Sequence, residues 1–369
     1  MRKKYMIEEI LMLIVLSASI GCNSKSGTIP TDEKYHEGCD AQYNFRVNAL
    51  EQSYVSKTEK GFYCSDDVNV RYVEDADLES IVLCNKAGCV HGNTDGCGAL
   101  IDGMVKNIQE YEERIYFLNY NNVSSLISER EDGSDRTTEM VFYDYDIIKN
   151  YIIHRGKMLF IYQNVTNEVN ESGIVYNTGI ASLDLNTKKI VNLLPDNNMT
   201  ETKDVYYDCL WGYGNNIYIY CEDNGESVFK KFNMSSEAIE DIKFDSDYQP
   251  YDIRWSDDKS IFWQSTQYED GVNLLIKSDF DGKNVEKIAK TDTDRSIYTN
   301  GEYIVTQNLF DKSVEIFDMN MNKIGNSDVA NGELNVIGFY ENKAYFATNG
   351  SNIVRILDLE HPEGYIEIQ

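Results

Sequence analysis

The chain has 369 residues, of which 34 are lysine or arginine and 62 are aspartate or glutamate, so its formal net charge is -28 at pH 7. Such an acidic protein is repelled by polyanions, which excludes nucleic acid as an expected partner. Hydrophobic residues make up 42% of the chain and aromatic residues 12%, which is typical of a folded protein rather than a disordered one. The 27 tyrosines favour strands and half-buried surfaces, so the composition favours a β-protein.

The N-terminus has the pattern of an export signal, with a basic start followed by an apolar run from Ile10 to Ile20. This run is about half the roughly 20 residues that a spanning helix needs. It ends in the stretch SIGC, which resembles a bacterial lipobox and predicts a lipid on Cys22; the alternative is an ordinary signal cleaved nearby. We therefore expect a signal peptide over residues 1–21, a lipid-anchored flexible tether over 22–42 and a folded domain over 43–369. The expected location is the outer face of the cytoplasmic membrane.

A repeat organises the rest of the chain. Each copy contains a turn, a short aromatic strand, a polar gap, and a second strand that ends in an acidic turn. Two hairpins in a period of about 42 residues, without a helical stretch, are typical of one blade of a β-propeller. The sequence therefore predicts an all-β propeller of seven four-stranded blades, with six or eight as alternatives. Equivalent positions in the seven aromatic strands are Tyr63, Tyr116, Leu159, Tyr218, Phe262, Ile304 and Tyr345.

Two intervals depart from this period. The stretch VFYDYD, residues 141–146, matches the second strand of the repeat, and only fifteen positions separate Asp144 from Leu159. That spacing is too short for a closing strand and a new opening strand, so the second blade is expected to be incomplete. The long interval before Tyr218 predicts a polar insertion, either at 164–177 or at 195–204.

The stretch LCNKAGCVHGNTDGC concentrates three cysteines and one histidine. Three thiolates and an imidazole form the four-ligand set of structural zinc sites, and the neighbouring glycines would let the backbone wrap around an ion. An exported protein more often oxidises its cysteines, so a disulfide knot within the set Cys39, Cys64 and the three cysteines of the stretch has equal weight. A nucleophilic Cys89 and His91 pair is a weaker alternative, because no third partner is identified. The predicted metal ligands are Cys84, Cys89, His91 and Cys97.

The other cysteines are assigned by position. Cys209 and Cys221 flank a predicted hairpin turn at residues 213–216 and would lie nearly opposite each other, which favours a cross-strand disulfide over two reduced thiols. If the metal site forms, Cys39 and Cys64 are left to pair with each other. This arrangement accounts for all eight cysteines.

The lipobox, the segment FYCSD, the Cys/His stretch and the train of aromatic strands together resemble a group of β-propeller lipoproteins from anaerobic Gram-positive bacteria that carry a domain of unknown function. In that group a similar Cys-x4-Cys-x-His-x5-Cys segment closes the first blade. The match covers nearly the whole mature chain, and it departs from the group at the Gly98-Ala99 ending and at the short junction near residue 150. The resemblance implies a surface-exposed propeller and no established activity.

Three functions remain open from the sequence. A non-enzymatic binding or scaffold module for a protein, peptide or glycan is favoured, since propellers present a broad, loop-lined face. Its tryptophans would permit stacking on sugar rings, although core packing is the more frequent use of such residues. The first alternative is a glycan-active lyase or hydrolase, for which His154 is a candidate acid-base group; a solvated or capped histidine is the simpler interpretation. The second is a metal- or redox-responsive accessory of an envelope complex. The three tryptophans are Trp211, Trp255 and Trp263.

Overall fold

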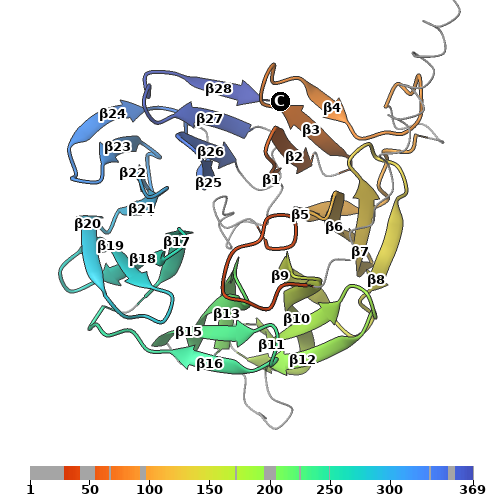
Figure 1. Ribbon diagram of the computed structural model, residues 1–369, viewed down its shortest axis with the longest axis horizontal. Coiled ribbons are helices and arrows are strands. Elements are labelled where there is room, and N and C mark those ends of the chain that lie inside the picture. Colours follow the sequence, from red (N-terminus) through yellow and green to blue (C-terminus); the bar gives the residue numbers. More distant parts are fainter. Residues whose placement is uncertain are drawn as a thin grey trace, which may run out of the picture. The chain divides into compact units, whose positions relative to one another are not determined.

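A computed structural model describes residues 29–41, 55–65, 68–91, 97–170, 173–194, 205–223, 226–248, 250–331, 334–347 and 354–368. Residues 31–369 form one compact unit. Within it, seven four-stranded antiparallel sheets are arranged in a ring around a central channel (Figure 1). The predicted seven-bladed β-propeller is therefore confirmed. None of the described segments forms a helix that is long and apolar enough to cross a membrane.

Each blade consists of four consecutive strands, and the first strand of each blade lines the channel (Figure 1). Blade 1 contains β1 (Val55–Lys57), β2 (Gly61–Ser65), β3 (Val70–Glu74) and β4 (Ser80–Val82). Blade 2 contains β5 (Met104–Tyr111), β6 (Arg114–Asn121), β7 (Val123–Arg130) and β8 (Thr137–Val141). Blade 3 contains β9 (Ile147–His154), β10 (Lys157–Asn170), β11 (Gly173–Asp184) and β12 (Ile190–Leu194). Blade 4 contains β13 (Val205–Tyr213), β14 (Asn216–Asp223), β15 (Glu226–Asn233) and β16 (Ile239–Ile242).

The remaining blades follow the same order. Blade 5 contains β17 (Asp252–Ser256), β18 (Ser260–Gln267), β19 (Val272–Asp279) and β20 (Glu286–Asp292). Blade 6 contains β21 (Arg295–Thr299), β22 (Tyr303–Asn308), β23 (Val314–Asp318) and β24 (Lys323–Ser327). Blade 7 contains β25 (Asn335–Tyr340), β26 (Lys343–Ala347), β27 (Val354–Asp358) and β28 (Tyr365–Ile368). We call the face formed by the turns between first and second strands the inner-turn face.

The aromatic repeat corresponds to the second strand of each blade. This strand has a neighbour on either side in its own sheet, and the adjacent blades cover both of its faces. All five residues of β2 are buried, as are the first six of β18 and the last five of β22. A strand covered on both faces is apolar along its whole length rather than at alternate positions, which explains why this part of the repeat is conspicuous in the sequence.

Blade 2 is complete, contrary to the expectation from the sequence. Its third strand is β7, which precedes the stretch assigned to that role, and residues 142–146 only connect β8 to β9. In this connection Phe142 and Tyr145 pack in a buried cluster with Phe160, the first ring tilted and the second edge-on, with ring centroids 5.2 and 5.3 Å from the Phe160 ring. Strand β7 was not predicted because its sequence, VSSLISER, mixes serine with aliphatic residues and lacks the aromatic residues that mark the repeat. The junction is short because its aromatic side chains enter the core directly.

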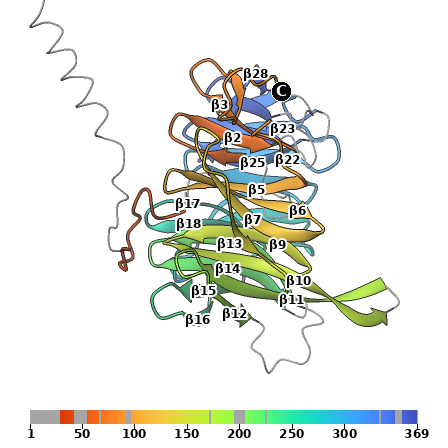
Figure 2. The same cartoon turned by 90° about the vertical axis from the view of Figure 1, so that its right-hand side faces the viewer.

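The predicted insertion lies in blade 3. Strands β10 and β11 are 14 and 12 residues long, and their far ends extend beyond the blade as a two-stranded arm (Figure 2). The first proposed position, 164–177, therefore carries an insertion that forms a strand extension rather than an irregular loop. The second, 195–204, lies outside the described residues.

No chain connection joins blades 7 and 1, because blade 1 is built from the first four strands and blade 7 from the last four. Phe62 and Tyr345 are fully buried and meet edge to face, with ring centroids 5.9 Å apart. The Lys57 ammonium lies over the Tyr340 ring, 4.1 Å from its centroid. We call this contact between blades 7 and 1 the seam.

Replacing Phe62 with alanine is expected to destabilise the protein by about 3–5 kcal/mol, because it removes a fully buried ring and leaves a cavity in the seam. Phe310→Ala serves as the matched control: its ring is 83% exposed, and the expected change is below about 0.5 kcal/mol. Urea denaturation followed by far-ultraviolet circular dichroism measures both. Equal losses in the two variants would contradict the assignment of the seam.

Candidate functional site

The predicted metal ligands converge. The thiol sulfurs of Cys84, Cys89 and Cys97 and a ring nitrogen of His91 all lie within 4.8 Å of one another. In a tetrahedral zinc site, bonds of about 2.0–2.3 Å place the ligand atoms roughly 3.5–3.8 Å apart, so a small contraction brings these four donors to an ion. His91 adopts a left-handed backbone conformation, with φ of 51°. Its Nδ1 lies 3.9 Å from the Cys97 sulfur.

The connection between β4 and β5 carries this cluster and is held to both blades 1 and 2. Leu83, next to the first ligand, is buried, and its amide donates to the Val70 carbonyl of β3. The β7–β8 turn of blade 2 packs against the backbone of Leu83 and Cys84 at Gly133, where an added Cβ would lie 2.6 Å from the Leu83 carbonyl carbon. Gly133 also has a positive φ of 75°, so both the close approach of the backbone and the left-handed conformation require glycine at this position.

The other end of the connection is fixed by an ion pair in blade 2. Arg136 pairs with the fully buried Glu129 carboxylate at 2.7 Å. Its two terminal nitrogens donate to the carbonyls of Leu100 and Ala99, directly after the last ligand. Burial raises the pKa of Glu129, and the Arg136 charge opposes that effect. The cluster therefore has rigid supports on both sides of it.

The local electrostatics favour thiolate at one position of the cluster. The hydrogen bond with His91, assisted by one with Cys89, lowers the pKa of Cys97 to about 6. At Cys89 the backbone hydrogen bond with His91 acts to lower the pKa of the thiol. The contact with Cys97 and partial burial act in the opposite direction and together outweigh it, so the net pKa of Cys89 is raised. A thiolate is the form in which cysteine ligates a metal.

The remaining cysteine assignments stay predictions. Cys39 carries a free thiol in this structure, and Cys64 lies in β2 within the seam cluster. The register pairs Cys209 with Tyr220 rather than with Cys221, because a β-bulge follows Tyr207. The side chain of Cys209 lies outside the described residues, and so does the whole of Cys22.

Residues 31–41 are not a flexible tether. They form a strap across the inner-turn face of blades 3 and 4, in the same compact unit as the propeller (Figure 1). Arg155, in the β9–β10 turn, binds both oxygens of the buried Asp40 carboxylate at 2.5 and 3.0 Å. It also donates to the carbonyls of Asp32 and Lys34. This attachment could not be predicted from the sequence, because Asp40 and Arg155 are 115 positions apart.

His154 is part of the same attachment. Its imidazole is fully buried; Nδ1 accepts from the Ala41 amide at 2.9 Å, and Nε2 donates to the Gly214 carbonyl at 2.7 Å. Burial lowers its pKa to about 4, outweighing the Asp40 carboxylate 4.0 Å away, so the ring is neutral at pH 7. Both nitrogens are occupied, so His154 is neither solvated nor placed to act as an acid or base.

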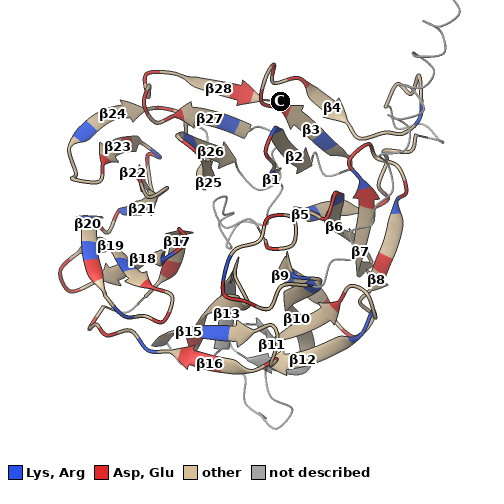
Figure 3. Cartoon of the chain, viewed as in Figure 1, with Lys and Arg blue, Asp and Glu red and all other residues tan. Residues whose placement is uncertain are grey.

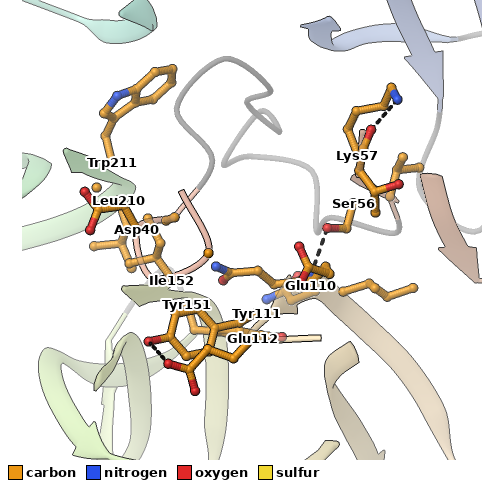
Figure 4. A pocket seen from close by; sticks show the side chains of 18 of the residues that line it. Asp40, Ser56, Lys57, Glu110, Tyr111, Glu112, Tyr151, Ile152, Leu210 and Trp211 are labelled. Carbon is orange, nitrogen blue, oxygen red and sulfur yellow. Dashed lines mark hydrogen bonds between the residues drawn. The ribbon is translucent and has the colours of Figure 1, made fainter. Parts of the chain in front are cut away.

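A cavity of about 220 Å³ lies at the inner-turn end of the channel, between the strap and the first strands of blades 1 to 4 (Figure 4). Most polar groups in its wall are used to join blades. The Gln109 amide bonds both the amide and the carbonyl of Ile153 at 2.7 Å, and Ser56 accepts from the Glu110 amide at 3.1 Å. Within blade 1, the Lys57 ammonium binds Asp75 and the Gly61 carbonyl, each at 2.9 Å. The wall is therefore a fixed scaffold.

Four glutamates also line this cavity. None of them has a lysine or arginine nitrogen within 4.0 Å among the described residues. Burial raises the pKa of Glu110, whose carboxylate accepts from the Glu113 amide. Elsewhere acidic residues are spread around all blades rather than gathered on one (Figure 3). The four cavity glutamates are Glu37, Glu59, Glu110 and Glu112.

Two of the three tryptophans are core residues, as the simpler interpretation expected. Trp211 is 3% exposed and donates to Ser256, and Trp263 is fully buried and donates to Ser278. Trp255 differs, because it is half-buried and lines a second cavity on the inner-turn face.

Sequence comparison finds no matching family model and no matching curated protein. Among solved structures, the propeller is similar to an oligogalacturonate lyase from Vibrio parahaemolyticus (TM-score 0.54, 9% identity, 89% of this chain and 90% of the lyase). It is also similar to a prolyl endopeptidase (0.57, 11%, 89% and 50%) and to an acylaminoacyl peptidase from Pyrococcus horikoshii (0.54, 10%, 86% and 52%). The chain spans about half the length of these two peptidases. Such low identities show the propeller fold alone.

The buried His154 predicts a specific pH dependence. The pKa of His154 in the folded protein lies below the unfolded value of 6.5. Between pH 6.5 and about 4 this imidazole is therefore protonated in the unfolded chain and neutral in the folded protein. Stability should fall by on the order of 3 kcal/mol as the pH drops through this window. His154→Asn removes this contribution, whereas His361→Asn, at an exposed site, keeps it. Urea denaturation at pH 7.0, 5.5 and 4.5 measures the difference, and parallel profiles for all three proteins would contradict the assignment.

Proposed function

We propose that this protein is a non-enzymatic binding module, held by a lipid on Cys22 at the outer face of the cytoplasmic membrane, with its ligand-binding surface on the inner-turn face. The observation that carries the proposal is the channel cavity. Its wall is fixed because side chains such as Gln109 join neighbouring blades, and it presents four glutamates that have no lysine or arginine nitrogen within 4.0 Å in the described parts of the chain. A fixed concave surface with a few unused polar groups suits recognition of a protein, peptide or glycan.

The same cavity disfavours the enzymatic alternative. Hydrolysis or elimination on a glycan needs two groups of suitable pKa that face each other across the substrate. The described wall residues include neither histidine nor cysteine, and both nitrogens of His154 are occupied, one by the Ala41 amide of the strap and the other by the Gly214 carbonyl of blade 4. Burial raises the pKa of Glu110, and its carboxylate accepts a hydrogen bond from the Glu113 amide of its own turn. The similarity to oligogalacturonate lyase rests on the fold and carries no chemistry to this chain.

Photo-crosslinking in cells tests the binding function. A benzoylphenylalanine at Glu37 or Glu59, both exposed at the cavity, is expected to crosslink one discrete partner. The same group at Tyr268 or Phe310, in exposed turns on the opposite face, is expected to give none. A Cys22→Ser chain should lose both membrane attachment and the crosslink.

Crosslinks at equal yield from both faces, or none from either, would contradict a binding surface at the inner turns. Retention of the Cys22→Ser chain in the membrane fraction would contradict the lipid anchor.

We also propose that the four-ligand cluster holds one structural zinc ion that ties the β4–β5 connection together. Three soft sulfurs and one imidazole are the donor set that zinc prefers. A disulfide knot would require two of the three sulfurs and would give His91 no role, yet the ring nitrogen of His91 points into the group of sulfurs. Bound zinc would stabilise the junction of blades 1 and 2, since binding energy at a structural site is folding energy.

His91→Ala is expected to lower the affinity for zinc by at least about 100-fold, because even outer contacts of a metal site are worth 10–100-fold. His361→Ala is the matched control at an exposed site. Native and denatured masses of residues 23–369, prepared without oxygen, should show one zinc ion that is lost on denaturation. A metal-free protein whose mass is lowered by paired hydrogens would make the cluster a disulfide knot.

A further inference from the structure

A second cavity, of about 720 Å³, opens on the inner-turn face over blades 5, 6 and 7. We call it the blade-5 groove, because a row of four directly paired residues crosses all strands of that blade and forms its wall: Trp255, Phe262, Lys277 and Glu286. Directly paired residues in an antiparallel sheet share a face, so the four side chains lie along one side of the blade, with Phe262 covered to 3% exposure between its neighbours. Ile288 and Met319 extend its apolar part.

The indole of Trp255 is held as a fixed platform. On one side the β21–β22 turn lies against it at Gly301, where an added Cβ would be 2.5 Å from the ring. Gly301 has a φ of 85°, so no other residue fits this position easily. The Phe262 ring packs against Trp255 with a centroid distance of 5.6 Å. A ligand in the groove therefore meets an aromatic surface that does not have to be ordered on binding.

The charges at the groove are unbalanced. Lys277 is the one cationic residue among its described lining, and its ammonium lies 5.3 Å from the centroid of the Phe262 ring. No lysine or arginine nitrogen in the described parts of the chain lies within 4.0 Å of the four carboxylates. These carboxylates belong to Asp257, Glu286, Glu302 and Glu341.

We infer that the blade-5 groove binds a basic peptide segment of a partner protein, through an arginine or lysine side chain laid on Trp255. A cation over an indole face is attracted by the ring quadrupole, and a guanidinium can stack there while it pairs with a carboxylate. The inference rests on the proposed binding function and names the chemistry of its partner.

The carboxylates decide between this ligand and others that stack on tryptophan. Any ligand that covers the groove removes water from Glu302 and Glu341, at a cost that a cation offsets and a neutral sugar ring does not. An anionic sugar or acidic peptide would be repelled outright. Charge complementarity therefore favours a basic segment over a glycan, although Trp255 alone would suit either.

Tryptophan fluorescence tests the inference on the full chain, because Trp255 is the half-buried one of the three indoles. The probes are the capped peptides acetyl-Gly-Arg-Gly-Arg-Gly-amide and its glutamine counterpart. We expect a saturable change with the arginine peptide, at least about tenfold weaker binding of the glutamine peptide, and weakening as salt rises from about 0.05 to 0.5 M.

Paired variants separate the groove from the general acidity of the protein. Glu302→Gln with Glu341→Gln should weaken binding of the arginine peptide by about tenfold or more. Glu269→Gln with Asp270→Asn removes the same charge from an exposed turn on the opposite face and should leave binding unchanged. Circular dichroism confirms the fold of both.

The inference is overturned by equal weakening in both pairs of variants, by equal binding of the two peptides, or by a response to neutral chitotriose without one to the arginine peptide. Absence of any saturable signal with the arginine peptide overturns it as well. If the crosslinks at Glu37 and Glu59 persist in that case, the binding module stands and only the basic partner is lost. If they are absent too, the proposed function fails with it.

Discussion

Closure of the ring depends on side-chain packing at the seam. Blades 1 and 7 come from opposite ends of the chain, and no strand is shared between them. Elsewhere in the ring a chain connection joins each blade to the next, whereas at the seam the contact of Phe62 with Tyr345 and that of the Lys57 ammonium with the Tyr340 ring hold the two blades together. Every surface that needs several blades in fixed positions depends on this contact, since an open ring would let blades separate on either side of the channel.

The channel cavity and the blade-5 groove both lie on the inner-turn face, and they differ in which blades supply their walls and their carboxylates. In the cavity, polar side chains such as Gln109 join neighbouring blades, and the carboxylates lie around this framework. In the groove, a single blade supplies the row from Trp255 to Glu286, and the turns of blades 6 and 7 add Glu302 and Glu341. The metal cluster lies elsewhere, on the connection between blades 1 and 2, so its loading can alter stability without touching either surface.

The sequence predicted features that repeat or lie close together along the chain. The aromatic second strands recur because they are buried on both faces, and the four candidate metal ligands, which converge in the structure, fall within fourteen consecutive positions, 84–97. Features set by distant residues escaped prediction. The pairing of Asp40 with Arg155 could not be predicted from the polar N-terminal stretch, and the serines of β7 kept it from being predicted as a strand. A bulge after Tyr207 shifted Cys209 from the register that the hairpin suggested.

The strap also determines where mechanical tension enters the molecule. The chain passes through the strap before it reaches β1, so a pull on residues upstream of 31 meets the bonds of Arg155 to the carbonyls of Asp32 and Lys34 first, and then its ion pair with Asp40. That ion pair is buried and consists of two charge-assisted hydrogen bonds, so it is a strong attachment to blade 3. The seam beside β1 is thereby relieved of the tension, and the ring can stay closed while its N-terminal end is under load.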